Sequence, residues 1–312
     1  MTIKKQKIIS AGLISLGVFG GFECLAYLIN LNQPVQFLKV AFLVYFYLLA
    51  KMVFLYDLHF KNPGALARAK ARHESVPHWL HRFLKILFSS FWGRIEHMRR
   101  WTYFKHFQNY LVLPAIVFWS TAALLYLNLG RTLFQQTFVV ISSLVLVVVY
   151  WNLKEIFSKK NEIVDHNIFV ALSAVKLYAA FITFSAALGL TGYFCLPPRF
   201  FALAIFSLSA LLIYQALFQH KLFGAKTLFF GVAVSLMLGA VAYWVRGIWG
   251  QNYFTAGGFL AVVYNFFWSV FHQYLHKGLN LKAFIELLFL SVIASGMLIS
   301  VTNFHARLIG AC

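Results

Sequence analysis

The stretch IFVALSAVKLYAAFITFSAALGL, residues 168–190, is apolar along its length except for a few small polar residues and one charged residue, Lys176. A helix of about 20 mainly apolar residues crosses the ~30 Å hydrocarbon core of a bilayer, so this stretch predicts a transmembrane helix. Similar stretches lie at 8–30, 36–57, 108–129, 133–151, 200–219, 227–245, 255–275 and 283–303. The sequence therefore predicts an all-α, polytopic helical integral membrane protein with about nine transmembrane helices.

The composition of the whole chain agrees with this class. Of the 312 residues, 61% are hydrophobic and 11% are charged, whereas charged residues make up about 25% of an average soluble protein. In a soluble protein the formal net charge of +19 would indicate nucleic-acid binding, but here the basic residues lie between apolar stretches and set membrane topology. We therefore expect no nucleic-acid partner, and the lipid bilayer as the solvent of the fold.

The basic residues are divided unequally between the two sides of the membrane. With the N-terminus in the cytoplasm, 20 of the 27 Lys and Arg residues fall on the cytoplasmic side, as the positive-inside rule requires. An odd number of spans then places the C-terminus on the non-cytoplasmic side. The first span continues without a small-residue cleavage site, so we interpret it as the uncleaved anchor of a multi-pass protein of the cell membrane.

A long connection after the second span divides the chain. Residues 1–57 are a predicted two-span N-terminal hairpin, residues 58–106 a basic cytoplasmic segment, and residues 107–312 a seven-span bundle. Within the basic segment, residues 77–92 carry Trp, Leu and Phe on one helical face and basic or polar residues on the other. This pattern predicts an interfacial amphipathic helix that contacts anionic lipid headgroups at the cytoplasmic face.

Ionisable residues inside spans are costly, and each one is a hypothesis of function. Lys51 and Glu286 lie near the cytoplasmic ends of their spans, where a long side chain reaches the interface. Lys176 lies deeper, roughly 12 Å from the start of its span at 1.5 Å per residue, so it needs a partner or water. Glu286 is at a compatible depth on the same side, and a pair between Lys176 and Glu286 is the predicted contact.

Glu23 lies in the outer half of the first span, beside glycines 17, 20 and 21. Small residues of this kind permit close approach of a second helix. The expected partner of Glu23 is Lys39, at the start of the adjacent span. Two interpretations stay open, a protonated carboxyl that is hydrogen-bonded between helices and a proton or cation site.

Polar residues follow one side of the eighth predicted span, with steps of four, three and four between Asn265, Ser269, His272 and His276. We expect this stripe to face protein. His272 and His276, at i and i+4, could bind one metal ion, with further ligands drawn from His166, Asp165, His220, Glu286, His73, His78 and His81. However, ten of the 11 histidines lie on the basic side of the membrane, which interfacial anchoring alone also explains. The chain also lacks the adjacent histidine pair of membrane desaturases and hydroxylases.

Three cysteines, Cys24, Cys195 and Cys312, show neither metal-binding spacing nor an even count. A bridge between Cys195 and Cys312 stays open, because both fall on the non-cytoplasmic side. The connections on that side are about 4 to 10 residues long, so no folded domain lies there.

These residues leave three functions open. The main hypothesis is a transport protein, a channel or a component of a membrane complex, in which Glu23, Lys176, Glu286 and the stripe from Asn265 to His276 line a polar path. The alternative is a membrane-embedded metal-dependent enzyme that acts on a lipid or isoprenoid at the cytoplasmic interface, with His272 and His276 as ligands. A structural subunit is the third reading, supported by the scarcity of catalytic groups. The sequence assigns neither a substrate nor a cofactor.

Overall fold

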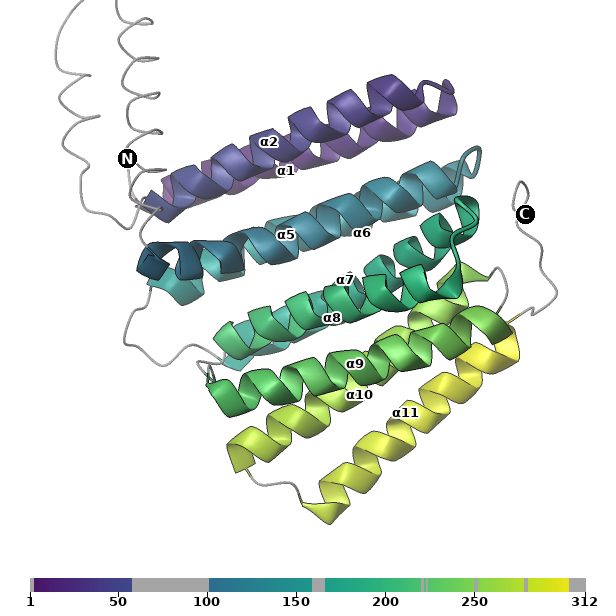
Figure 1. The fold of residues 1–312 in the computed structure, drawn as a ribbon. Coiled ribbons are helices and arrows are strands. Elements are labelled where there is room, and N and C mark those ends of the chain that lie inside the picture. The colour runs from purple at the N-terminus through teal and green to yellow at the C-terminus, as the bar shows by residue number, and fades with distance from the viewer. Residues whose placement is uncertain are drawn as a thin grey trace, which may run out of the picture.

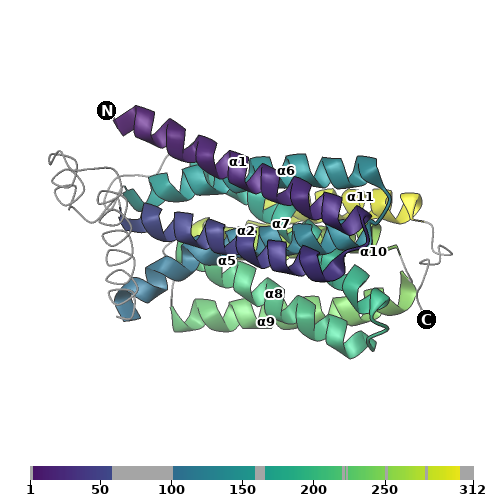
Figure 2. The ribbon, with the colours of Figure 1, turned by 90° about the horizontal axis from the view of Figure 1, so that it is seen from above.

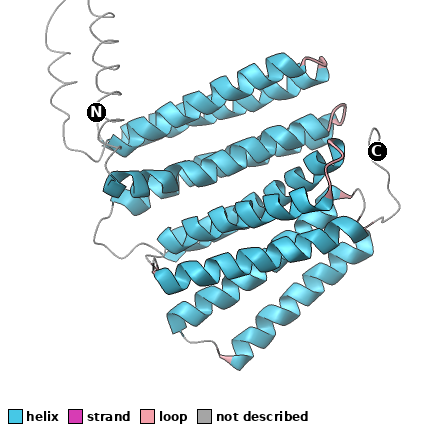
Figure 3. Cartoon of the chain, viewed as in Figure 1, coloured by secondary structure: helices cyan, strands magenta, loops and turns pink. Residues whose placement is uncertain are grey.

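The computed structural model describes residues 3–57, 101–158, 166–219, 222, 224–249, 252–277 and 280–302. Within these ranges the regular structure is α-helical throughout (Figure 3). The helices are α1 Ile3–Asn30, α2 Pro34–Asp57, α5 Trp101–Leu127, α6 Thr132–Ser158, α7 His166–Tyr193, α8 Pro198–Gln219, α9 Ala225–Ile248, α10 Tyr253–Lys277 and α11 Leu281–Val301. They lie side by side in one bundle (Figure 1).

Eight of the described helices are long and apolar enough to cross a membrane, which confirms the predicted class of polytopic helical membrane protein. The remaining helix, α5, contains an apolar stretch at Leu111–Leu127 within its 27 residues. Every predicted span coincides with one helix. Most of the helices extend beyond the predicted spans, because a helix continues into the headgroup region after its apolar part has ended.

Consecutive helices run in opposite directions. At one end of the bundle, which we call the short-loop end, α1 is joined to α2 by residues 31–33, α5 to α6 by 128–131, and α7 to α8 by 194–197. The end of α9, the start of α10 and the end of α11 lie there as well (Figure 1). The sequence predicted short connections on the non-cytoplasmic side of the membrane, and the connections at this end of the bundle are short. The long connection between α2 and α5 belongs to the opposite end.

The centre of the bundle is α7. It packs against α5, α6, α8 and α10, and viewed from above it lies between α6 and α8 (Figure 2). More than half of its apolar span, 56%, is buried, whereas α11 packs mainly against α10 and has no buried residue in its span. A charge on α7 is therefore enclosed by protein, while a charge on α11 is not.

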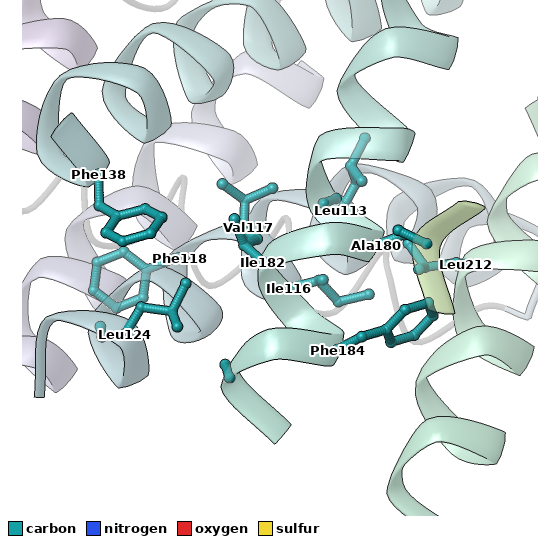
Figure 4. Close-up of a cluster of buried hydrophobic side chains, with 14 of the residues drawn as sticks. Leu113, Ile116, Val117, Phe118, Leu124, Phe138, Ala180, Ile182, Phe184 and Leu212 are labelled. Carbon is teal, nitrogen blue, oxygen red and sulfur yellow. The ribbon is translucent and has the colours of Figure 1, made fainter. Parts of the chain in front are cut away.

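The core around α7 is built from branched and aromatic side chains (Figure 4). The residues that meet there from α5, α6, α7 and α8 are Leu113, Ile116, Val117, Phe118, Leu124, Phe138, Ala180, Ile182, Phe184 and Leu212. Phe118 also stacks on Phe22 of α1, with ring centroids 5.4 Å apart. Since water does not drive helices together inside a membrane, such close packing of side chains holds the bundle.

Glycine allows the closest helix contacts. A Cβ atom at Gly257 of α10 would lie 2.6 Å from the backbone nitrogen of Ser185 on α7. In the N-terminal hairpin, Gly17 faces Tyr47 and Gly21 faces Val44, but nothing lies against Gly20. The predicted role of small residues in α1 is thus confirmed at two of the three glycines.

Some sequence predictions fall outside the described residues. The interfacial helix 77–92, Cys312 and most of the basic segment are among them. The described part of that segment, from Trp101, already belongs to α5, because its aromatic and polar residues continue the helix beyond the apolar stretch. Cys195 is disulfide-bonded, and Cys24 is free. The N-terminal hairpin packs on α5 and α6. The division of the chain after residue 57 stays a prediction from the sequence.

Candidate functional site

Lys176 is enclosed at the centre of the bundle. It lies ten residues after the start of α7, about 15 Å along the helix axis, and only 4% of its surface is exposed. Its Nζ lies 5.7 Å from the centroid of the Trp268 ring on α10. Among the residues whose side chains the structure describes, Lys176 is the one charged residue that is buried. Lys176, which the sequence placed deeper in its span than Lys51 and Glu286, is therefore enclosed by protein.

The predicted partner of Lys176 is wrong. Glu286 is exposed on α11, and α10 packs against both α7 and α11, so a helix separates the two charges. In the described part of the chain the ammonium makes its one recorded contact with the face of Trp268. A cation over an aromatic ring gains about 0.5–2 kcal/mol. This gain is smaller than the cost of several kcal/mol for burying one charge.

Two buried hydroxyl groups between α7 and α10 lack a hydrogen-bond partner among the described residues. They belong to Ser185 of α7 and Tyr264 of α10. Tyr264 is one helical turn from Trp268 on the same face of α10, and its ring lies 6.1 Å from Phe184. Ser185 lies nine residues after Lys176, about 13.5 Å further along the helix axis, so we call Lys176, Tyr264 and Trp268 alone the α7–α10 site. A buried hydroxyl without a partner costs about 1–3 kcal/mol, so the site holds polar groups that do not stabilise the fold.

The other faces of α7 are different, because their polar groups are paired. Thr183 shares a hydrogen bond of 2.8 Å with Ser120 of α5. Tyr178 is 2.8 Å from Ser142 of α6, which accepts a second bond from Thr121. Among the described residues of α7, the buried hydroxyl without a hydrogen-bond partner is that of Ser185, on the side that faces α10. Ser143 of α6 and Gln215 of α8 also carry buried polar atoms without a described partner.

A second polar cluster closes the short-loop end. The Tyr253 hydroxyl of α10 donates to Asn128 Oδ1 at 3.0 Å. Asn30 of α1 donates to Gln135 of α6 at 2.9 Å, and Asn128 and Gln135 are each 1% exposed. We call Asn30, Asn128, Gln135 and Tyr253 the short-loop network.

Sequence reasoning missed the short-loop network. Its members are uncharged and lie at the ends of spans, where polar residues are ordinary, so their presence carried no signal.

Glu23 has a different partner from the expected one. Its Oε2 accepts a hydrogen bond of 3.0 Å from Gln136 of α6, whereas Lys39 is exposed on α2. The prediction of Lys39 is therefore wrong, because α1 packs on α6 as well as on α2. This geometry agrees with a carboxyl group that is hydrogen-bonded between helices.

The polar stripe of α10 is not covered along its whole length. Asn265 is exposed, so the expectation that the stripe faces protein is wrong at this position, while Ser269 and His272 are half-buried. The ring of His272 lies 5.8 Å from that of Trp268, which places His272 one turn from the α7–α10 site. The structure does not describe the side chain of His276.

The candidate metal site lacks ligands in the described part of the chain. No three His, Cys, Asp or Glu side chains gather there around a common point. Glu286, one of the candidate ligands, is exposed on α11, and the side chains of the other candidates are not described. The metal-binding hypothesis for His272 and His276 therefore gains no support from the geometry.

No protein-family model matches the chain, and neither a curated protein nor a solved structure matches it. The function must therefore be argued from the site alone.

Proposed function

We propose that the protein is a membrane transport protein whose solute binds at the α7–α10 site. The observation that carries this proposal is a buried lysine, Lys176, without a carboxylate partner in the described structure. An ionisable residue that is enclosed in the membrane marks a solute or ion pathway by default. Stability alone would favour an apolar side chain at this position, because an unpaired charge is expensive to bury.

The arrangement along α10 supports a pathway. Tyr264, Trp268 and His272 follow one another at intervals of four residues, so they form a row along one face of the helix. From Tyr264 this row runs toward the end of the bundle opposite the short loops. At the short-loop end, the bond between Tyr253 and Asn128 ties α10 to α5. We infer a state that is closed at the short-loop end and in which the polar row leads to the other end.

The orientation in the membrane is part of the proposal. The N-terminus lies in the cytoplasm, because 20 of 27 basic residues then fall on the cytoplasmic side. The disulfide at Cys195 supports the same orientation, since disulfides persist on the oxidising side of a membrane. An impermeant maleimide applied to intact cells tests it, in a Cys24→Ser background. Gln33→Cys should react at once and Lys226→Cys only after permeabilisation; the reverse pattern would overturn the orientation.

Transport is tested by flux into proteoliposomes that contain the purified full-length protein. Swelling in isosmotic solutions of anions, cations and neutral solutes identifies the class that enters. Lys176→Met should lower the flux of the transported solute at least about tenfold, because about 1.4 kcal/mol of lost binding has this effect. The matched control is Lys282→Met, since Lys282 is exposed on α11.

Two outcomes would overturn the proposal. One is swelling that never exceeds that of empty vesicles for any solute. The other is unchanged flux in Lys176→Met together with co-purification of a partner protein, which would indicate a structural subunit.

A further inference from the structure

We propose that the α7–α10 site binds a small monovalent anion, of the kind represented by chloride, bromide and nitrate. This inference rests on the proposed function, because it names the class of the transported solute. It starts from the sign of the buried charge. Lys176 is the one buried charged group among the described side chains. The two carboxylates with described side chains lie elsewhere, Glu23 bonded to Gln136 on α6 and Glu286 exposed on α11. A cation entering the site would be repelled, and an anion would be attracted.

The neighbouring groups suit an anion as well. The hydroxyl of Tyr264 is buried and bonds to no described residue, and it can rotate its hydrogen toward an acceptor. Hydrogen bonds to a charged acceptor are about twice as strong as those between neutral groups. An anion that Lys176 and Tyr264 hold together would therefore use a donor that the fold leaves unused.

The surroundings restrict the charge and the hydration of this anion. Aromatic rings border the site, Trp268 at the ammonium and Phe184 beside Tyr264, so water is scarce there. One lysine neutralises one negative charge, and a divalent anion would leave the second charge buried and unpaired. A monovalent anion with a low cost of dehydration meets both conditions.

Trp268 has a defined role in this arrangement. The ammonium of Lys176 lies over the ring of Trp268, which compensates part of its charge. An anion would offer the ammonium a stronger contact. Binding should therefore change the environment of Trp268, and its fluorescence reports this change when the signal of a Trp268→Phe variant is subtracted.

The first experiment measures binding to the full-length protein in detergent, without transport. Thermal unfolding is followed in sodium bromide or nitrate and compared with sodium gluconate at the same ionic strength, since gluconate carries the same charge but several hydroxyl groups, which are costly to bring into an apolar site. The unfolding midpoint of the wild type should rise by several degrees, because a ligand that binds the folded state stabilises it. This rise should vanish in Lys176→Met, shrink in Tyr264→Phe and persist in Lys282→Met.

Two further variants replace Lys176→Met if that variant does not fold. They are Lys176→Arg, which retains the charge, and Tyr264→Phe. Lys176→Arg should still respond to bromide, with an affinity changed by its different geometry, and Tyr264→Phe should bind bromide more weakly. An equal response to bromide and gluconate, or the same response in Lys176→Met as in the wild type, would overturn the anion site.

The second experiment measures bromide uptake by proteoliposomes, and the two results separate the two proposals. Bromide binding that depends on Lys176 but brings no uptake would uphold the anion site and overturn transport. Uptake of a neutral or cationic solute that depends on Lys176, without bromide binding, would uphold transport and overturn the anion. Binding and uptake that are both lost in Lys176→Met would support both.

Discussion

The short-loop network and the α7–α10 site lie in the same bundle, but their polar groups differ in hydrogen bonding. In the network, Tyr253 donates to Asn128 and Asn30 donates to Gln135. In the site, Tyr264 has no described hydrogen-bond partner, and the ammonium of Lys176 lies over a ring. A satisfied polar group inside a membrane ties helices together, whereas an unsatisfied one weakens the fold. The difference separates groups that hold the bundle from groups that are available to a ligand.

The largest effect is expected where the two helices of the site touch. Gly257→Ala places a Cβ atom against the backbone of Ser185, so α7 and α10 must move apart, and we expect a loss of about 3 kcal/mol or more. Thermal unfolding in detergent measures it. The matched control is Gly296→Ala on α11, where the added atom meets nothing and the higher helix propensity of alanine should raise stability slightly. Equal effects of both substitutions would mean that α7 and α10 are not in close contact.

A smaller loss is expected in the short-loop network. Tyr253→Phe removes the donor to the buried Asn128 and should cost about 1–2 kcal/mol. Tyr126→Phe is the control at the same end, because its hydroxyl makes only an exposed contact of 3.4 Å with Tyr193. If Tyr253→Phe is as stable as Tyr126→Phe, the network does not hold α10 to α5.

The sign should reverse at the α7–α10 site. Tyr264→Phe removes a buried hydroxyl without a partner and should leave stability unchanged or raise it by up to about 1 kcal/mol. Tyr178→Phe on α7 is the counterpart, because it breaks the bond to Ser142 and should lower the unfolding temperature. A destabilised Tyr264→Phe variant would show that this hydroxyl is satisfied in the membrane, and the comparison between the two regions would fail.

The smallest effect is expected at Glu23. Glutamine at this position still offers an oxygen to Gln136, so Glu23→Gln should change stability by less than about 0.5 kcal/mol. Solute flux should also be unchanged if the carboxyl serves only as a link between α1 and α6. A loss of flux with normal stability would instead restore the interpretation of Glu23 as a proton or cation site.

The sequence was sufficient for the helices because bilayer thickness dictates their length. The predicted span 168–190 became α7, His166–Tyr193, and the other spans match as closely. The position of Lys176 along its helix followed from the same count, since a helix rises by a fixed distance per residue.

The partners of the polar residues did not follow from the sequence. Residues at one depth, such as Lys176 and Glu286, meet only if their helices are neighbours, and here α10 packs against both helices. Glu23 likewise faces Gln136 because α1 packs on α6. Which faces meet is decided by the fit of many apolar side chains such as Phe22 and Phe118, and the position of one polar residue carries no information about that fit.

The bonds of the short-loop network also bear on how the protein is made. Asn128 and its donor Tyr253 are 125 positions apart, and Asn30 and Gln135 are 105 apart. A ribosome adds residues from the N-terminus at about 5–20 per second, so α5 enters the membrane well before α10 exists. During that interval the Oδ1 atom of Asn128 lacks its final donor. The bond between Asn30 and Gln135 can form as soon as α6 is inserted, whereas the bond that ties α10 to the end of α5 forms only in the last stage of assembly.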